Sequence, residues 1–186
     1  MVIVGIDGGF VRLGLSAISL TDEGIRLLNF GLIRNQRGEE TFNEFLTAGI
    51  EQITMDFPRF LALNQPNLIV SETIPVGKLG SSNSQVVAAV TTCHVIAIQQ
   101  GIPWQNLGAN TVKKAVTGDG KASKTLIRNT ILDRFPSIAQ KHAELKREQK
   151  EAGDKTRPGL PQDVFDSVAV ALTGAMKTEL DEKETM

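Results

Sequence analysis

The sequence contains few of the residues that build disulfides and zinc sites. It has one cysteine and two histidines among 186 residues. A single cysteine excludes an intrachain disulfide and fits a reducing setting. Cys93 lies in an apolar helical stretch, which is typical of a small core residue rather than of a nucleophile. His94 lies in the same stretch and His142 in a polar one, so we expect a structural role for the first, a solvated position for the second and no zinc site.

Long apolar runs are also missing. No stretch is long enough to cross a bilayer and we find no signal peptide, so we predict a cytoplasmic protein. The hydrophobic content of 41% and the charged content of 22% are ordinary for a folded domain. We therefore expect one domain over residues 1–177, with residues 178–186 as a charged, frayed tail.

The chain as a whole has no excess of positive or negative charge, but one segment of it is basic. The net charge is −1, which by itself gives no sign of a nucleic-acid partner. Residues 110–157, however, contain twelve Lys and Arg against six Asp and Glu, whereas the rest of the chain contains eight against fifteen. A basic segment on a nearly neutral chain indicates binding to a polyanion.

Apolar patterning predicts an α/β domain with a five-stranded mixed sheet flanked by helices. Three successive strands form an antiparallel meander, and two further strands alternate with helices. The predicted strands are Val2–Asp7, Leu13–Leu20, Ile25–Arg34, Asn67–Val70 and Ile102–Leu107. The predicted helices are Glu39–Leu63 with a possible interruption at Pro58, Gln85–Gln100, 110–116, 123–135 and Gln162–Lys177. Residues 73–84 are predicted as a loop.

Two further segments have unusual patterns. Helix 85–100 carries apolar residues on nearly every face, so we expect it to be buried all round by the sheet and a second subunit. Residues 139–157 are almost wholly polar, which fits either a solvated helix or a loop that orders on binding.

Two predicted strands end in an acidic residue. Asp7 follows a buried apolar run and precedes Gly8 and Gly9, and Glu72 follows Leu68–Ser71 in the same way. If these strands are parallel neighbours, both carboxylates lie at one edge of the sheet, where ligand sites of α/β sheets occur. We expect the two glycines to turn the chain and to keep side chains away from the carboxylate.

The last helix supplies two more carboxylates. Asp163 and Asp166 are three residues apart and therefore share one helix face. Acids in a first helical turn also stabilise the helix dipole, so a purely structural role stays open for this pair. Four converging carboxylates would repel one another strongly, and hard divalent cations such as Mg²⁺ or Mn²⁺ resolve that repulsion. Two such ions can activate water and stabilise a leaving oxygen in phosphodiester hydrolysis.

These motifs resemble those of the RuvC family of Holliday junction resolvases, within the RNase H-like nuclease superfamily. The resemblance extends over nearly the whole chain. It rests on Gly5–Gly9 with Gly14, on Ile69–Glu72, on Val112–Gly118 leading to Lys124, and on Asp163–Ala171.

The resemblance implies an RNase H-like fold and a homodimer formed through helix 85–100. Such a dimer binds a four-way DNA junction and nicks two strands symmetrically with Mg²⁺, for which Mn²⁺ can substitute. The implied metal ligands and catalytic acids are Asp7, Glu72, Asp163 and Asp166, with Lys124 as a further catalytic residue. Lys113 and Lys124 match the family's basic positions near the cleaved DNA, and Lys114 and Lys121 are close enough in sequence to share DNA binding.

The sequence departs from the family in two places. The family has an aromatic residue shortly after the strand-end glutamate, which stacks in the opened junction, whereas here no aromatic residue lies between Glu72 and Trp104. Residues 139–157 are longer and more polar than the family's link before the last helix, and because they are basic we predict that they contact DNA arms.

Three alternative functions remain open. A related RNase H-like nuclease would act on branched DNA, flaps or RNA–DNA hybrids. A junction-binding protein without catalysis would keep the basic segment but would not need all four acids. A sugar-kinase or actin-like ATPase fragment also opens with a strand, an Asp and glycines, but that fold needs a second lobe, and 186 residues hold only one.

Overall fold

A mixed sheet of five strands forms the centre of the molecule, as the sequence predicts. The computed structural model describes residues 1–36, 38–39, 41–74, 81–153 and 159–184. The strand order is β3-β2-β1-β4-β5, with β2 antiparallel to both β1 and β3, and β4 parallel to both β1 and β5. The strands are β1 (Val2–Asp7), β2 (Arg12–Thr21), β3 (Gly24–Arg34), β4 (Leu68–Glu72) and β5 (Trp104–Leu107).

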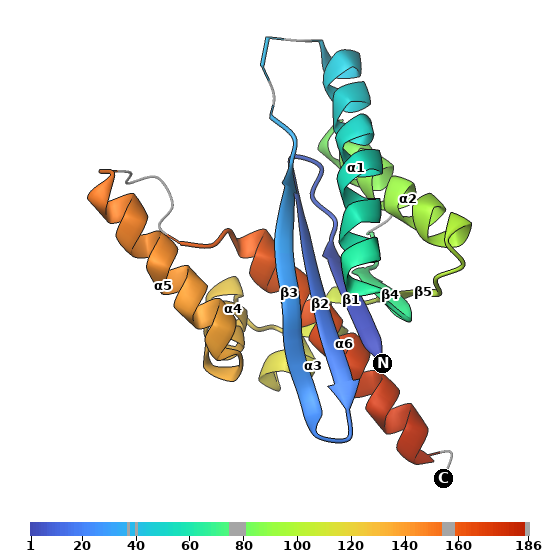
Figure 1. The fold of residues 1–186 in the computed structure, drawn as a ribbon, viewed down its shortest axis with the longest axis vertical. Coiled ribbons are helices and arrows are strands. Elements are labelled where there is room, and N and C mark those ends of the chain that lie inside the picture. The colour runs from blue at the N-terminus through green and yellow to red at the C-terminus, as the bar shows by residue number, and fades with distance from the viewer. Residues whose placement is uncertain (37, 40, 75–80, 154–158, 185–186) are drawn as a thin grey trace.

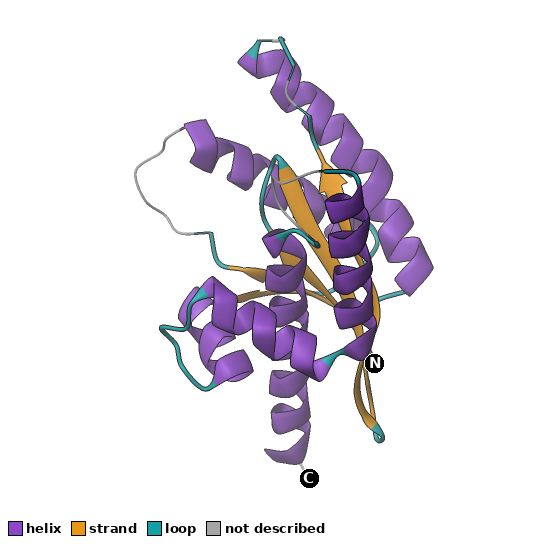
Figure 2. Cartoon of the chain, turned by 90° about the vertical axis from the view of Figure 1, so that its left-hand side faces the viewer, coloured by secondary structure: helices purple, strands orange, loops and turns teal. Residues whose placement is uncertain are grey.

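Helices cover both faces of this sheet (Figures 1 and 2). One face packs against α1 (Phe42–Asn64) and α2 (Ser81–Gln99). The other packs against α6 (Gln162–Glu184), with the smaller helices around it. These are α3 (Ala109–Thr117), α4 (Lys124–Arg134) and α5 (Pro136–Glu151).

Side-chain alternation along β1 assigns each residue to one of these two layers. Val4 and Ile6 are fully buried in the core formed with α1 and α2, whereas Ile3 is buried in the core formed with α6. Because successive side chains of a strand point to opposite faces, Gly5 and Asp7 lie on the α6 side. A Cβ atom at Gly5 would come within 2.3 Å of the carbonyl oxygen of Ser167, so α6 lies directly on the backbone of β1.

The helix boundaries differ from the predicted ones at several points. Helix α1 runs through Pro58 without interruption. Helix α2 begins at Ser81, so part of the predicted loop 73–84 is helical, while residues 75–80 lie outside the described residues. Helix α6 continues to Glu184 past the end of the sheet (Figure 1), so the predicted frayed tail is helical up to that residue. The glutamates, the leucine and the single lysine of the tail are good helix formers, so a charged sequence did not exclude a helix here.

Two features of the helical layers bear on function. The polar segment 139–157 is helical as far as Glu151, and residues 154–158 lie outside the described residues. The prediction that α2 is buried all round is not met within one chain, since Val87, Val95 and Ile98 are 39%, 47% and 66% exposed. Among the described residues, no helix is long and apolar enough to span a membrane.

Candidate metal centre

The two strand-end carboxylates lie beside each other. In the parallel ladder of β1 and β4, Ile6 pairs with Ser71, so the next residue on each strand is Asp7 and Glu72. Val70 is buried against α6, and the alternation of the strand therefore directs Glu72 to the same side as Asp7. The predicted meeting of these two acids at the carboxyl edge of the sheet is confirmed.

The first turn of α6 brings the other two acids to this edge. Gly14 of β2 pairs with Asp7, and a Cβ atom at Gly14 would lie 2.0 Å from the carbonyl oxygen of Asp163. Any side chain at this position would therefore push the helix away from the strands. Asp166 follows one turn later on the same helix face. Gly5 and Gly14 together allow α6 to approach the strands closely enough for its acids to face Asp7.

The proximity of the acids changes their protonation. Burial, and then the charges of Asp166, Asp163 and Glu72, raise the pKa of Asp7 from 3.8 to about 8. Burial and the charge of Asp166 also raise the pKa of Glu72, against the opposing effect of Lys124 and Lys113. The charge of Lys124 opposes this rise in the Asp7 pKa but does not cancel it, so the site has too little positive charge to keep Asp7 ionised at neutral pH.

Both helix acids are already paired with a cation. Lys124 at the start of α4 donates a hydrogen bond from Nζ to Oδ2 of Asp166 over 3.2 Å, and Gln162 donates from Nε2 to Oδ1 over 2.9 Å. Burial lowers the pKa of Lys124, but the charges of Asp166, Asp7 and Asp163 raise it more, so its net shift is upward. Arg12 places Nε 3.1 Å from Oδ2 of Asp163.

Sequence reasoning missed two members of this cluster, Arg12 and Gln162. Arg12 precedes Gly14 by two residues on β2 and therefore faces α6, but the predicted strand began at Leu13 and left Arg12 outside it. Gln162 carried no signal, because its contact with Asp166 depends on the exact start of α6.

The donor set fits a hard divalent cation. All four acids offer oxygen atoms, which Mg²⁺ and Mn²⁺ prefer. Oδ2 of Asp163 is buried and accepts no hydrogen bond, although Nε of Arg12 lies 3.1 Å away. Among the described residues, no three potential ligands are already gathered closely enough to hold a metal ion.

The four predicted lysines fall into two groups. Lys124 and Lys113 lie close enough to the acids to affect their pKa values, as described above. Lys114 and Lys121 are exposed nearby. Lys114 lines a hollow with Asn110 and Gly120, and Lys121 follows in the turn before α4. All four therefore lie on the α3–α4 side of the acids, although only two of them face the carboxylates.

Two predictions about this region are wrong. The space at Gly8 is taken by α2, since a Cβ atom there would come within 2.5 Å of Val90, and at Gly9 it would meet the carbonyl oxygen of Arg12 at 2.2 Å. The predicted turn is present, with a hydrogen bond from the N–H of Gly9 to the carbonyl oxygen of Asp7, but the glycines make room for α2 and for the turn and do not keep the carboxylate accessible. His142 is not solvated but 7% exposed, because the segment before α6 folds back over it.

His94 packs as the sequence suggested. Its ring stacks on Trp104 at a centroid distance of 4.7 Å, which fits a structural role on the α2 side of the sheet.

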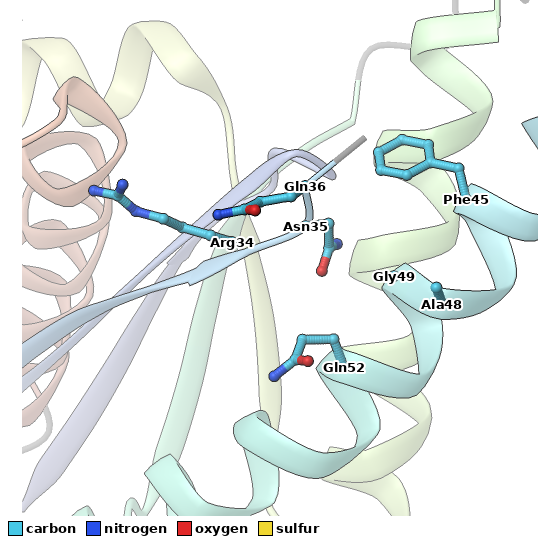
Figure 3. Close-up of a pocket in the computed structure, with 7 residues that line it drawn as sticks. All are labelled: Arg34, Asn35, Gln36, Phe45, Ala48, Gly49 and Gln52. Atoms are coloured by element: carbon cyan, nitrogen blue, oxygen red, sulfur yellow. The ribbon is translucent and has the colours of Figure 1, made fainter. Parts of the chain in front are cut away.

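A separate hollow lies between the end of β3 and α1 (Figure 3). It measures about 300 Å³ and is lined by Arg34, Asn35, Gln36, Phe45, Ala48, Gly49 and Gln52. Asn35 is 5% exposed and donates from Nδ2 to the carbonyl oxygen of Phe10, while its Oδ1 accepts no hydrogen bond. In the part of the chain that the structure describes, the lining contains amides and no acid, and none of the four acids of the candidate metal centre is part of it.

Comparison with known proteins adds independent findings. Residues 3–144 match the family model described as Crossover junction endodeoxyribonuclease RuvC. The protein of that name from Gloeobacter violaceus is 29% identical over 175 residues, which cover 94% of this chain and 87% of the relative. That from Citrifermentans bemidjiense is 31% identical over 147 residues, 77% of this chain and 85% of the relative. The structure of Thermus thermophilus RuvC in complex with a Holliday junction substrate superposes with a TM-score of 0.74 at 21% identity, covering 97% of this chain and 96% of that one.

Proposed function

Because this chain belongs to the RuvC family of crossover junction endodeoxyribonucleases, we propose that it resolves four-way DNA junctions by paired symmetric nicks. The observation that carries the proposal is the meeting of Asp7 and Glu72 with the first turn of α6 at one sheet edge. The upward shift of the Asp7 pKa to about 8 marks that edge as a place that needs added positive charge.

In this proposal Asp7, Glu72, Asp163 and Asp166 hold Mg²⁺, for which Mn²⁺ substitutes. The chemistry supplied by two such cations, when bound, is activation of water and stabilisation of the leaving oxygen. The acids hold the cations in fixed positions because they are attached to β1, β4 and α6, which pack on one another. Oδ2 of Asp163 accepts no hydrogen bond, although Arg12 lies beside it, which supports a role as a ligand.

The lysines bind and orient the DNA. Lys124 has a side chain that is 74% exposed although its ammonium group reaches Asp166, so the same group is within reach of a phosphate placed at the acids. Lys113 binds phosphate beside Lys124, and Lys114 and Lys121 extend the basic surface along the DNA backbone. Together they neutralise phosphates on the side where the acids would otherwise repel them.

A homodimer through α2 would place two such centres on one junction. Val87, Val95 and Ile98 lie on one face of α2 at helical spacing and are exposed in the single chain. Apolar exposure of this kind is typical of a protein interface. Two symmetric nicks then follow from two symmetric active sites.

The exposed basic side chains of α5 supply a further contact with DNA arms. Lys141, Lys146, Arg147 and Lys150 are exposed on this helix. Junction stacking by an aromatic residue after Glu72 has no candidate before Trp104, and Trp104 itself stacks on His94.

The proposal is tested by a nicking assay on four radiolabelled substrates: a mobile four-way junction, a flap, an RNA–DNA hybrid and a linear duplex. We expect Mg²⁺-dependent paired nicks on the junction alone, and loss of nicking with retained junction binding for Glu72→Gln. Asp22→Asn, in the exposed turn at the opposite end of the sheet, is the matched control and should cut normally. Preferred cutting of flaps or hybrids would favour a related nuclease, and binding without cutting would indicate a junction-binding protein.

A further inference from the structure

The segment that leads into α6 is held by two side chains of α5. His142 is 7% exposed, although it belongs to a helix whose other residues are mostly polar and exposed. Its Nδ1 accepts a hydrogen bond of 2.9 Å from the backbone N–H of Leu160. Two helical turns later, Oε1 of Gln149 accepts a hydrogen bond of 2.5 Å from the N–H of Gly159. Two consecutive backbone donors are thus bound by one face of α5.

The imidazole ring is also packed against α6 itself. Its centroid lies 5.3 Å from that of Phe165 with the rings nearly perpendicular, an edge-to-face arrangement. Gly159 has a φ of +96°, and a Cβ atom there would come within 2.5 Å of the ring. The chain therefore passes over His142 at van der Waals distance before it turns into α6.

The place where α6 begins decides where its acids lie. Asp163 and Asp166 follow Leu160 by three and six residues, and Phe165 lies between them. On the opposite side of the helix start, Gly14 leaves no space for α6 to move toward β2. The helix start is thus confined between β2 on one side and His142 on the other.

We propose that His142 is a positioning residue for the candidate metal centre. Its neutral imidazole holds the Leu160 N–H and the Phe165 ring, and so sets the position of Asp163 and Asp166 relative to Asp7. This inference rests on the proposed function, since it assigns His142 to the geometry of the same acids. The sequence, in contrast, predicts that residues 139–157 contact DNA arms and that His142 is solvated.

The role requires the neutral form of the ring. A protonated imidazole donates from both nitrogen atoms and cannot accept the N–H of Leu160. The charged groups that act on His142 are Lys146 on α5 and Arg128 on α4, whereas α6 presents the Phe165 ring and the 159–160 segment presents backbone N–H groups. Burial, followed by these two cations, lowers the pKa of His142, so the ring is neutral at neutral pH.

The experiment compares His142→Leu, which removes the acceptor, with His142→Asn, whose Oδ1 can take the place of Nδ1. Leucine should lower kcat for junction nicking about tenfold, the usual effect of a lost hydrogen bond in a buried site, and leave the Kd for the junction within about twofold. Asparagine should restore kcat to within about threefold of the wild type. The wild-type rate should fall at low pH through an extra titrating group that the asparagine variant lacks. Gln140→Leu, on the exposed face of the same helix, is the control and should leave kcat and the pH profile unchanged.

Hydrogen exchange keeps the test independent of catalysis. In His142→Leu the amides of residues 160–166 should exchange faster, while those of β1 and β4 keep their protection. Unchanged protection of 160–166, or an asparagine variant as impaired as the leucine variant, would overturn the proposal for His142. Wild-type protein that never cuts a junction would instead refute the proposed function, and the exchange result would still decide whether His142 holds the helix start.

Discussion

Replacement of Asp7 by asparagine should make the metal-free protein more stable while it abolishes cleavage. In the folded chain the carboxyl group keeps its proton up to about pH 8, whereas its ordinary pKa is 3.8. The folded state therefore binds the proton more tightly than the unfolded state, and stability falls as the pH rises from about 4 to 8. Each pKa unit corresponds to about 1.4 kcal/mol, so the cost at pH 7 is about 4 kcal/mol.

Asparagine has the same shape without the charge, so it avoids this cost. In EDTA, the free energy of unfolding of Asp7→Asn should match the wild type near pH 4 and exceed it by about 4 kcal/mol at pH 7. For a chain of this size that difference raises Tm by about 10 °C. Urea unfolding followed by circular dichroism at pH 4, 5.5, 7 and 8 measures the difference directly. Asp22→Asn in the exposed hairpin turn should show no such pH-dependent gain.

Addition of Mg²⁺ provides the second half of the test. A cation that binds only the folded wild type stabilises it by an amount that grows with the logarithm of its free concentration above Kd, and the variant should gain much less. The difference between the two proteins should therefore shrink when EDTA is replaced by millimolar Mg²⁺. An Asp7→Asn protein that is less stable than the wild type at pH 7, or a difference that does not grow with pH, would refute the electrostatic account of this site.

Three further variants test the neighbouring features. Gly14→Ala should destabilise the fold by about 1–3 kcal/mol through overpacking, because its Cβ would displace Asp163. It should also remove the Mg²⁺-dependent rise in Tm. Gly31→Ala, whose nearest neighbour would lie 3.9 Å away, is the control and should change neither the stability nor the Mg²⁺-dependent rise in Tm. Lys113→Gln and Lys121→Gln should each weaken junction binding and reduce the slope of log K against log salt by about 1, measured by fluorescence anisotropy. Lys177→Gln, near the C-terminal end of α6, is the control and should leave that slope unchanged. Ile98→Asp should convert a dimer into a monomer by light scattering at micromolar concentration, whereas Leu28→Asp, at a position on β3 that is 52% exposed against 66% for Ile98, should not. A wild-type monomer would contradict the α2 interface.

The strands and the strand-end acids were predictable because they depend on local pattern. A buried apolar run that stops at a carboxylate occurs twice, and a parallel pairing of β1 and β4 brings Asp7 beside Glu72. The spacing of Asp163 and Asp166 likewise fixed a shared helix face. These features need no knowledge of how the layers pack.

The remaining features depend on packing between distant segments. The burial of His142 follows from residues 159–161 folding back over α5, and the polar sequence of α5 gave no sign of it. The ion pair of Arg12 with Asp163 joins residues from opposite ends of the chain. The space at Gly8 could not be assigned from the sequence, because Val90 of α2 fills it only after the helix has docked.

The close approach of α6 to Gly5 and Gly14 also has a consequence for the order of events during translation. The N-terminal part of a chain leaves the ribosome first and can begin to fold there. The sheet and most of the helices that cover it therefore leave the ribosome before residues 163–166. Until then the nascent chain contains Asp7 and Glu72 without the two acids of the last helix. Under the proposed function, nuclease activity is therefore acquired only when α6 docks, and we expect a chain that stops before Asp163 not to cut DNA.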